Sequence, residues 1–146
     1  MLLRTVVMLV DDEVGFVDAM AKRLNKRDLE ILTAYSGHEA LQKLGASDKV
    51  DVVILDVKMP VMDGIETLRE IKKAHPMIEV IMLTGHATVE TGIAGMKLGA
   101  FDYLVKPCDI EQLIVKVQQA KSKKNEHEEK ITQARINEIT LRHNGG

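Results

Sequence analysis

The chain has 146 residues, 45% of them hydrophobic and 29% charged, and a formal net charge of -2. This length fits one domain, and the composition is ordinary for a soluble globular protein. The charge offers no basic footprint for nucleic acid, and no apolar run approaches the ~18 residues of a membrane span. A single cysteine, Cys108, excludes an intrachain disulfide framework. Because no signal peptide precedes the first strand pattern, a cytoplasmic location is expected.

Short apolar runs alternate with helical patterns along the chain. The runs are Thr5–Val10, Leu29–Ala34, Val52–Asp56, Val80–Thr84 and Phe101–Lys106, and the helical stretches are Val14–Lys26, Gly37–Leu44, Ile65–Ala74, Val89–Leu98 and Ile110 onward. Alternation of this kind predicts an α/β fold, in which helices cover both faces of a parallel sheet.

The polarity of the runs predicts their order in the sheet. The first, third and fourth runs are almost wholly apolar, so both faces of these strands should be buried. The second run carries Glu30 and Thr33, and the fifth carries Asp102 and Lys106, so these two strands should lie at or near the edges. A flavodoxin-like, doubly wound, five-stranded sheet of order 2-1-3-4-5 satisfies both conditions.

Local signals predict where the helices begin and end. Capping boxes are expected at Ser36-x-x-Glu39, Asp63-x-x-Glu66 and Asp109-x-x-Gln112, helix C-terminal positions at Gly45 and Gly99, and a helix stop at His75-Pro76. These signals support the helical stretches named above.

The composition changes near residue 120, which predicts a globular domain at 1–120 and a polar helical extension at 121–146. An incomplete heptad pattern runs through the last helix: Val117, Ala120, Ile131, Ala134 and Leu141 fit it, and Lys124, His127 and Glu138 interrupt it. Pairing of this helix in a homodimer and a solvated helical tail are the two open alternatives.

Reactive side chains follow four of the predicted strands. Asp11 and Asp12 follow the first strand and Asp56 closes the third, while Thr84 and Lys106 close the fourth and fifth. The carboxyl ends of parallel strands meet at one edge of the sheet, so these five side chains should lie together. Packed carboxylates repel one another, and a magnesium ion would relieve that repulsion.

This set of side chains suits magnesium-assisted phosphoryl transfer to a carboxylate. Asp56 would be the nucleophile, Lys106 would pair with phosphoryl oxygens, and the Thr84 hydroxyl would donate a hydrogen bond to another oxygen. Each residue alone could equally be a turn, a helix cap or an edge charge. Their conjunction at successive strand ends favours the chemical interpretation.

The motifs resemble the receiver domains of two-component response regulators over about Arg4 to Gln119. The resemblance is carried by Val-Asp-Asp-Glu at 10–13, Leu-Asp-Val-Lys-Met-Pro-Val-Met-Asp-Gly at 55–64, Leu-Thr-Gly-His at 83–86 and Gly-Ala-Phe-Asp-Tyr-Leu-Val-Lys-Pro at 99–107. The last motif looks most like receivers of the nitrogen-regulation type, which usually precede an ATPase and a DNA-binding domain.

The resemblance implies a role for each site residue. Asp56 would accept a phosphoryl group from a phosphohistidine of a sensor histidine kinase or a phosphotransfer protein. Asp12 would bind Mg²⁺ directly and Asp11 largely through water, with Asp56 and the backbone carbonyl of Lys58 as further ligands. Thr84 and Lys106 would bind the phosphoryl group and Tyr103 would be the aromatic switch. The Lys106-Pro107 peptide bond would be cis.

By the same resemblance the domain is a signalling module that catalyses only its own phosphorylation and dephosphorylation. It would present the face formed by its fourth helix, fifth strand and fifth helix to a downstream protein target. The short segment after Gln119 suggests a stand-alone receiver without direct nucleic-acid or membrane binding. The alternative is the receiver fragment of a longer DNA-binding transcription regulator. A haloacid-dehalogenase-type phosphatase fits less well, because Asp11 and Asp12 are adjacent rather than spaced as Asp-x-Asp.

Overall fold

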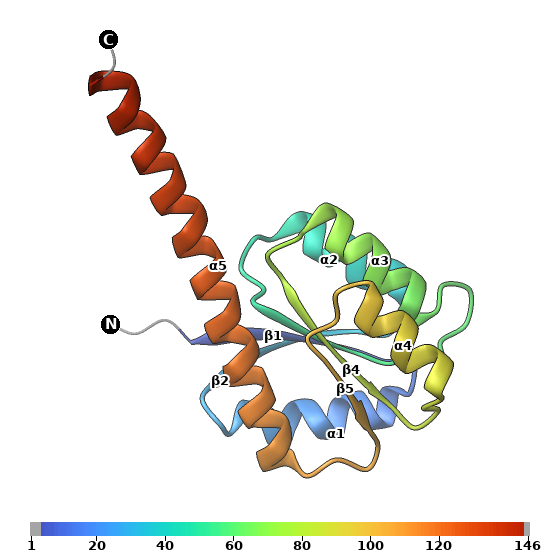
Figure 1. Cartoon of the computed structure of the whole chain (residues 1–146). Helices are drawn as coiled ribbons and strands as arrows, with labels where there is room; N and C mark the ends of the chain where they lie inside the picture. Colours follow the sequence, from blue (N-terminus) through green and yellow to red (C-terminus); the bar gives the residue numbers. More distant parts are fainter. Residues whose placement is uncertain (1–3, 145–146) are drawn as a thin grey trace.

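The computed structural model describes residues 4–144 (Figure 1). The strands are β1 (Thr5–Val10), β2 (Leu29–Ala34), β3 (Val52–Leu55), β4 (Glu79–Thr84) and β5 (Asp102–Val105), and the helices are α1 (Val14–Asn25), α2 (Gly37–Ala46), α3 (Gly64–Ala74), α4 (Val89–Lys97) and α5 (Ile110–Asn144). All ten predicted elements are present, with small differences at their ends. The expected features at Met1–Leu3 and Gly145-Gly146 lie outside the described residues.

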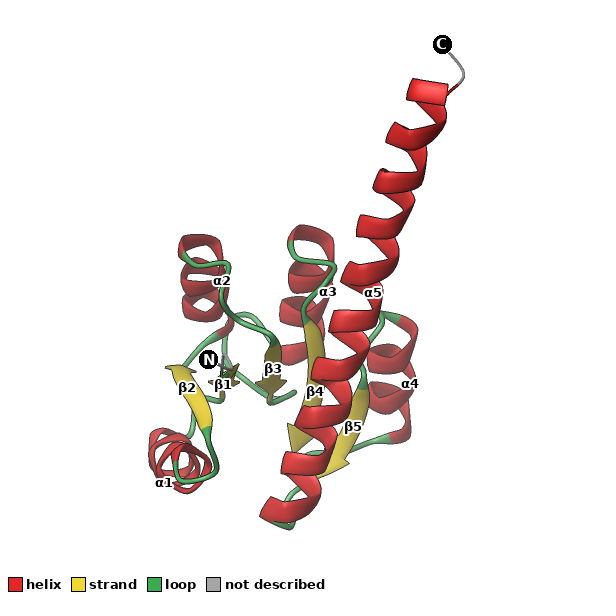
Figure 2. Cartoon of the chain, turned by 90° about the vertical axis from the view of Figure 1, so that its left-hand side faces the viewer, coloured by secondary structure: helices red, strands yellow, loops and turns green. Residues whose placement is uncertain are grey.

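The five strands form one parallel sheet of order β2-β1-β3-β4-β5, as predicted. Helices α1 and α5 cover one face, and α2, α3 and α4 cover the other (Figures 1 and 2). Every residue of β3 and β4 is buried, whereas β2 and β5 contain partly or fully exposed positions. The prediction that the two more polar strands lie at the edges is therefore confirmed.

Alternating side chains of the strands pack into two separate cores, one on each face of the sheet. In β1, Val7 and Leu9 join the core under α1 and α5, while Val6, Met8 and Val10 join the core under the other three helices. This division follows from the two-residue period of a strand, which sends successive side chains to opposite faces. The apolar runs in the sequence therefore fill both cores at once.

The helix boundaries agree only partly with the sequence signals. Ser36 and Asp63 cap α2 and α3 by accepting hydrogen bonds from the backbone amides three residues later, and the positive φ of 98° at Gly99 fits a helix end. The expectation for Gly45 is wrong: α2 continues to Ala46, because nothing at this exposed position stops it. The complete capping box lies at α4 instead, and Thr88 and Thr91 form it.

Helix α5 is tied to the amino-terminal edge of the sheet by a cluster of charges. Asp51, just before β3, accepts hydrogen bonds from the Val6 amide at 2.9 Å, from Lys121 Nζ at 2.8 Å and from Lys124 Nζ at 3.2 Å. Glu79, the first residue of β4, is 2% exposed, and its Oε2 lies 3.7 Å from Lys123 Nζ. These contacts hold the helix at the point where it leaves the domain.

The part of α5 beyond this cluster extends away from the domain (Figures 1 and 2). Val117 and Ala120 are fully buried against the sheet, so they are unavailable for pairing with a second helix. Of the later apolar residues, Ile136, Ile139 and Leu141 are exposed. Homodimer formation through this segment stays a prediction. Only the residues after Lys124 are available to contact a second helix. Within residues 4–144 no helix is both long and apolar enough to cross a membrane.

The Asp51 cluster predicts a pH-dependent contribution to stability. Burial alone would raise the pKa of Asp51, but the hydrogen bonds from Lys121, Val6 and Lys124 hold that pKa below its ordinary 3.8. A carboxylate of this kind stabilises the fold above its unfolded-state pKa, and that stability is lost as pH falls through the folded-state pKa. We expect Asp51→Asn to lower the free energy of unfolding at pH 7 by about 1–3 kcal/mol in urea titrations.

The difference between Asp51→Asn and the wild type should shrink at pH 3, where protonation of Asp51 begins to remove the same charge from the wild type. Asp48→Asn, an exposed substitution in the same loop, is the matched control and should change stability by less than about 0.5 kcal/mol. An equal loss at both pH values would contradict a charge-based role for Asp51.

Candidate functional site

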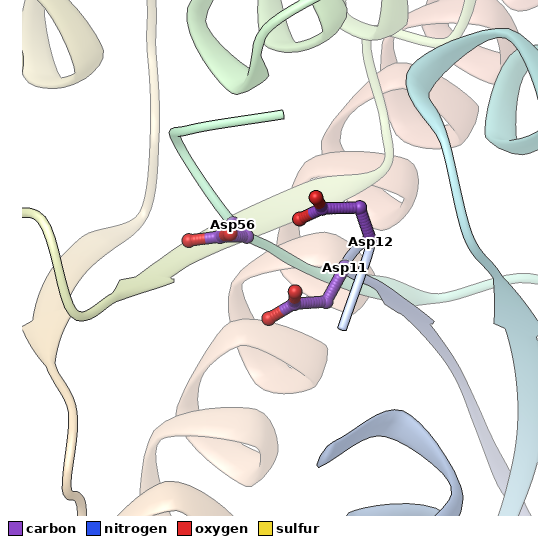
Figure 3. A group of neighbouring side chains, drawn as sticks. All are labelled: Asp11, Asp12 and Asp56. Atoms are coloured by element: carbon purple, nitrogen blue, oxygen red, sulfur yellow. The ribbon is translucent and has the colours of Figure 1, made fainter. Parts of the chain in front are cut away.

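Three carboxylates meet where β1 and β3 end, as Figure 3 shows. Val10 of β1 is paired in register with Leu55 of β3, and the Asp56 amide donates to the Val10 carbonyl at 3.0 Å. The residues that follow the two strands are therefore neighbours. Oxygen atoms of Asp11, Asp12 and Asp56 all lie within 4.8 Å of one another. The prediction that these strand ends come together is confirmed.

The three carboxylates differ in burial and in their hydrogen bonds. Asp11 and Asp56 are 1% and 3% exposed, while Asp12 faces solvent. Both oxygens of Asp11 are occupied, since Oδ1 accepts from the Glu13 amide at 2.9 Å and Oδ2 accepts from Lys106 Nζ at 2.6 Å. Asp56 Oδ1 is buried without a hydrogen-bond partner. A buried oxygen without a partner requires an explanation, and a bound cation would supply one.

The charge on Asp56 is unfavourable in this setting. Burial raises its pKa, and the neighbouring charge of Asp11 adds to the increase. The Thr84 hydroxyl and the Lys106 ammonium act in the opposite direction but do not restore the ordinary value. The cluster therefore has the property expected of a site that gains from a bound cation.

Lys106 reaches the cluster from the end of β5. Its backbone amide donates to the Thr84 carbonyl at 2.9 Å, and its side chain is 14% exposed. Burial lowers the pKa of Lys106, but the charges of Asp11, Asp56 and Glu13 outweigh burial and raise it. The Lys106-Pro107 peptide bond is cis, as the resemblance implied.

Thr84 and Tyr103 lie on the neighbouring strands β4 and β5, at different distances from the carboxyl edge of the sheet. Thr84 is fully buried at the end of β4, and its Oγ1 accepts a hydrogen bond from the His86 amide at 3.0 Å. Tyr103 is paired with Met82, two residues earlier on β4, and its hydroxyl lies 2.6 Å from Thr91 Oγ1 on α4. Tyr103 therefore contacts α4 rather than the carboxylates.

A pocket of about 450 Å³ opens beside the carboxylates. Its lining comes from three loops and consists of Asp12, Glu13, Lys58, Met59, Pro60 and His86. Lys58 and His86 thus flank the approach from solvent to the carboxylates.

Two features of the site were not predicted from the sequence. Gly64 begins α3 against the backbone of Asp56, where an added Cβ would lie 2.0 Å from the Asp56 carbonyl oxygen. The Asp-Gly pair at 63–64 was a signal for this close approach. The second feature is the ring of Phe16 on α1, whose centroid lies 3.9 Å from Lys106 Nζ. In the sequence Phe16 was only one apolar residue of the helical stretch Val14–Lys26, and no signal pointed to this contact.

The sheet order and the carboxylates at its carboxyl edge define a receiver-type signalling domain. Residues 7–118 match the family described as the response regulator receiver domain. The chain belongs to this family, which receives signals in two-component systems.

Curated relatives are longer proteins. The chain is 41% identical over 108 residues to the "Transcriptional regulatory protein ZraR" of Salmonella typhimurium, covering 73% of this chain and 24% of that protein. It is 36% identical over 126 residues to the "DNA-binding transcriptional regulator NtrC" of Escherichia coli, covering 86% and 27% respectively. The chain thus spans about a quarter of the length of these relatives, which agree with a receiver of the nitrogen-regulation type.

Solved receiver structures are similar over most of the chain. A response regulator receiver domain protein from Clostridium thermocellum is 38% identical, with a TM-score of 0.79, and covers 83% of this chain and 97% of that one. A CheY-like receiver domain protein from Methanospirillum hungatei is 26% identical, with a TM-score of 0.81 and coverage of 86% and 99%. The family and the fold are therefore shown from sequence and structure independently.

The unfavourable charge of Asp56 predicts that its removal stabilises the metal-free protein. Because the folded state raises the pKa of Asp56, the wild type loses stability as pH rises from the ordinary 3.8 through the folded-state value. Asp56→Asn keeps the shape and removes the charge. We expect its melting temperature at pH 7 in a chelator to exceed that of the wild type, by about 2–4 °C per kcal/mol gained.

The gap between the two melting temperatures should close below pH 3.8 and narrow when magnesium is added to the wild type. Asp12→Asn, at the exposed member of the cluster, is the matched control and should gain less. If the wild type were more stable than Asp56→Asn at pH 7 without metal, the neighbouring groups would already compensate the charge of Asp56.

Proposed function

We propose that this receiver accepts a phosphoryl group on Asp56 from a phosphohistidine of a sensor histidine kinase or a phosphotransfer protein. The observation that supports this most is the unpartnered, buried Oδ1 of Asp56 between two further carboxylates and a lysine. Most buried carboxylate oxygens have a hydrogen-bond partner; the other exception among the described residues is Glu79 Oε2, which lies 3.7 Å from the Lys123 ammonium. Asp56 differs in lying beside the carboxylates of Asp11 and Asp12, close to the pocket that Asp12 lines.

Mg²⁺ fits the donor set of this site. Magnesium takes hard oxygen ligands and usually keeps several waters, and the exposed side of Asp12 leaves room for them. Asp12, Asp56 and the backbone carbonyl of Lys58 would hold the ion, with Asp11 acting largely through water because both its oxygens are already occupied. When bound, the ion supplies positive charge to the transferring phosphoryl group.

The transfer itself is a displacement at phosphorus. A carboxylate oxygen of Asp56 forms a P–O bond while the P–N bond to the donor imidazole breaks, and the imidazole nitrogen takes the electron pair and then a proton. Lys106 and Thr84 would bind phosphoryl oxygens through the ammonium and the hydroxyl. Attack of water on the phosphorus of the acyl phosphate then breaks the P–O bond to Asp56, releases inorganic phosphate and returns Asp56 to its carboxylate form. The domain would thus catalyse only its own phosphorylation and dephosphorylation.

Phosphorylation would be read out on the face formed by α4, β5 and α5. Exposed apolar side chains gather on these elements: Val89, Ile93, Met96, Val105 and Val115. The Tyr103 hydroxyl contacts Thr91, which also takes part in the α4 capping box, so a rotation of Tyr103 would remove a partner from the start of α4. A downstream protein target would bind this face in one of its two states.

We propose further that 1–120 act as the receiver and 121–146 as a helical extension, since Ala120 is the last fully buried residue of α5. The alternative is that the receiver serves a longer DNA-binding transcription regulator. It is favoured by the relatives, of which this chain spans about a quarter. In either case we propose that the receiver itself binds protein partners rather than nucleic acid. The length of the native coding frame separates the two alternatives.

Phosphorylation tests the proposed function directly. The chain should gain the mass of one phosphoryl group from acetyl phosphate when magnesium is present and lose the reaction in a chelator. Asp56→Asn should abolish the gain, because the amide lacks a nucleophilic oxygen. Asp63→Asn is the matched control, since Asn also caps helices and should keep α3 in place. Phosphorylation of Asp56→Asn at the wild-type rate would refute the assignment.

Hydrogen exchange tests the readout. Beryllofluoride with magnesium should mimic the acyl phosphate and change amide protection most across Gly85–Tyr103. Gly92→Ala should reduce that change, because Ala stabilises a helix by about 1 kcal/mol over Gly and no atom outside α4 lies within 4 Å of the added Cβ. Gly15→Ala in α1, which is equally free of contacts, is the control. A change confined to the Asp56 loop would contradict the proposed readout face.

A further inference from the structure

The ammonium group of Lys106 is enclosed by two acids and one aromatic ring. Asp11 Oδ2 lies 2.6 Å from Nζ, Glu13 Oε1 lies 3.7 Å from it, and the centroid of the Phe16 ring lies 3.9 Å from it. Asp11 and Glu13 follow β1, and Phe16 lies in the first turn of α1. The loop after β1 and the first turn of α1 therefore bring all three groups to the same cation.

The aromatic ring and the two acids interact with the Lys106 ammonium in different ways. An ammonium has three N–H donors, and Asp11 accepts one of them at hydrogen-bond distance, whereas the Glu13 oxygen is too far to accept another. The face of an aromatic ring attracts a cation through its quadrupole without accepting a strong hydrogen bond. Phe16 can therefore hold the charge in place while a donor stays free.

We propose that Phe16 is a positioning residue for phosphoryl transfer, which holds the Lys106 ammonium by a cation–π contact and leaves an N–H directed to the incoming phosphoryl oxygen. This inference rests on the proposed phosphorylation of Asp56. A third carboxylate in place of the ring would bind Lys106 more strongly but would compete with the phosphoryl group. A solvated position would instead leave the long Lys106 side chain free to adopt many conformations.

The competing explanation is that Phe16 only packs against the apolar core under α1 and α5, which it also contacts. The second ring–lysine contact in the described chain, Phe101 with Lys123, shows the difference between the two situations. There the ammonium lies 5.7 Å from the ring centroid and its side chain is 56% exposed. The Lys106 contact is shorter and far less exposed to water.

Fluorinated phenylalanines separate the two explanations, because fluorine withdraws electrons from the ring while keeping its shape and apolar character. Mono-, di- and trifluorophenylalanine are introduced at position 16 in the full chain. The rate of Asp56 phosphorylation by acetyl phosphate is then measured at saturating magnesium. We expect the logarithm of the rate to fall with each fluorine, reaching about 2- to 10-fold slower for the trifluoro variant.

Two control series use residues that the chain already offers. The same fluorinated residues at position 101 should leave the rate unchanged. In a Lys106→Met background, which has no cation at this place, the series at position 16 should be flat. Phe16→Tyr and Phe16→Trp keep a ring and should retain most of the rate, whereas Phe16→Leu should lose it while melting within a few degrees of the wild type.

A measurement without magnesium or phosphate gives an independent readout. The side-chain methylene protons of Lys106 next to Nζ should resonate upfield in the metal-free protein because of the ring, and Phe16→Leu should remove that shift. A flat fluorine series with Asp56 still phosphorylated, or Lys106 resonances at ordinary positions, would overturn the role of Phe16. If no variant and not even the wild type is phosphorylated, the proposed function itself fails, and the role of Phe16 falls with it.

Discussion

The ion pair between Lys106 and Asp11 is the contact on which the arrangement of the site depends. It joins the end of β5 to the end of β1 across two intervening strands, over 95 positions of sequence. Without the lysine, three carboxylates would face one another at the edge of the sheet, and such clusters raise their own pKa values. One ammonium cannot neutralise three carboxylates, so the site keeps an excess of negative charge. That excess of negative charge favours the binding of a hard cation at this site.

Asp51 and Asp56 lie at opposite edges of the sheet and differ in how their charges are compensated. At the amino-terminal edge, both oxygens of Asp51 receive hydrogen bonds, and two lysines of α5 contribute to them. At the carboxyl edge, the buried Oδ1 of Asp56 has no partner. Hydrogen bonds stabilise the charge of Asp51, whereas burial and the charge of Asp11 destabilise the charge of Asp56. A parallel sheet makes this division natural, because all strands begin at one edge and end at the other.

The sequence predicted the elements, their order and the meeting of the carboxylates, because each depends on a pattern that local residues carry. Alternating apolar runs define strands, and polar residues within two runs indicated the sheet edges. The features that it did not predict depend on three-dimensional contacts. Phe16 meets Lys106 only after α1 packs on β1 and β2 and the Lys106 side chain reaches Asp11 at the end of β1. The positive φ of 67° at the exposed Val61 is the opposite of what a β-branched residue favours. Gly45 was misjudged because a glycine near a helix end is permitted, not obliged, to stop it.

The same contacts indicate where a movement at the site can go. Helix α5 begins three residues after Pro107 and is anchored by five fully or nearly buried side chains and then by Asp51, so it resists displacement. Helix α4 buries only Gly95 within its own span, while α3 buries four residues. A displacement of Thr84 or Lys106 should therefore move α4, which few buried side chains hold, more easily than α5. Segments with few buried contacts are those that open first in folded proteins. This asymmetry favours a local response in α4 and β5, with α5 serving as the fixed frame against which that response occurs.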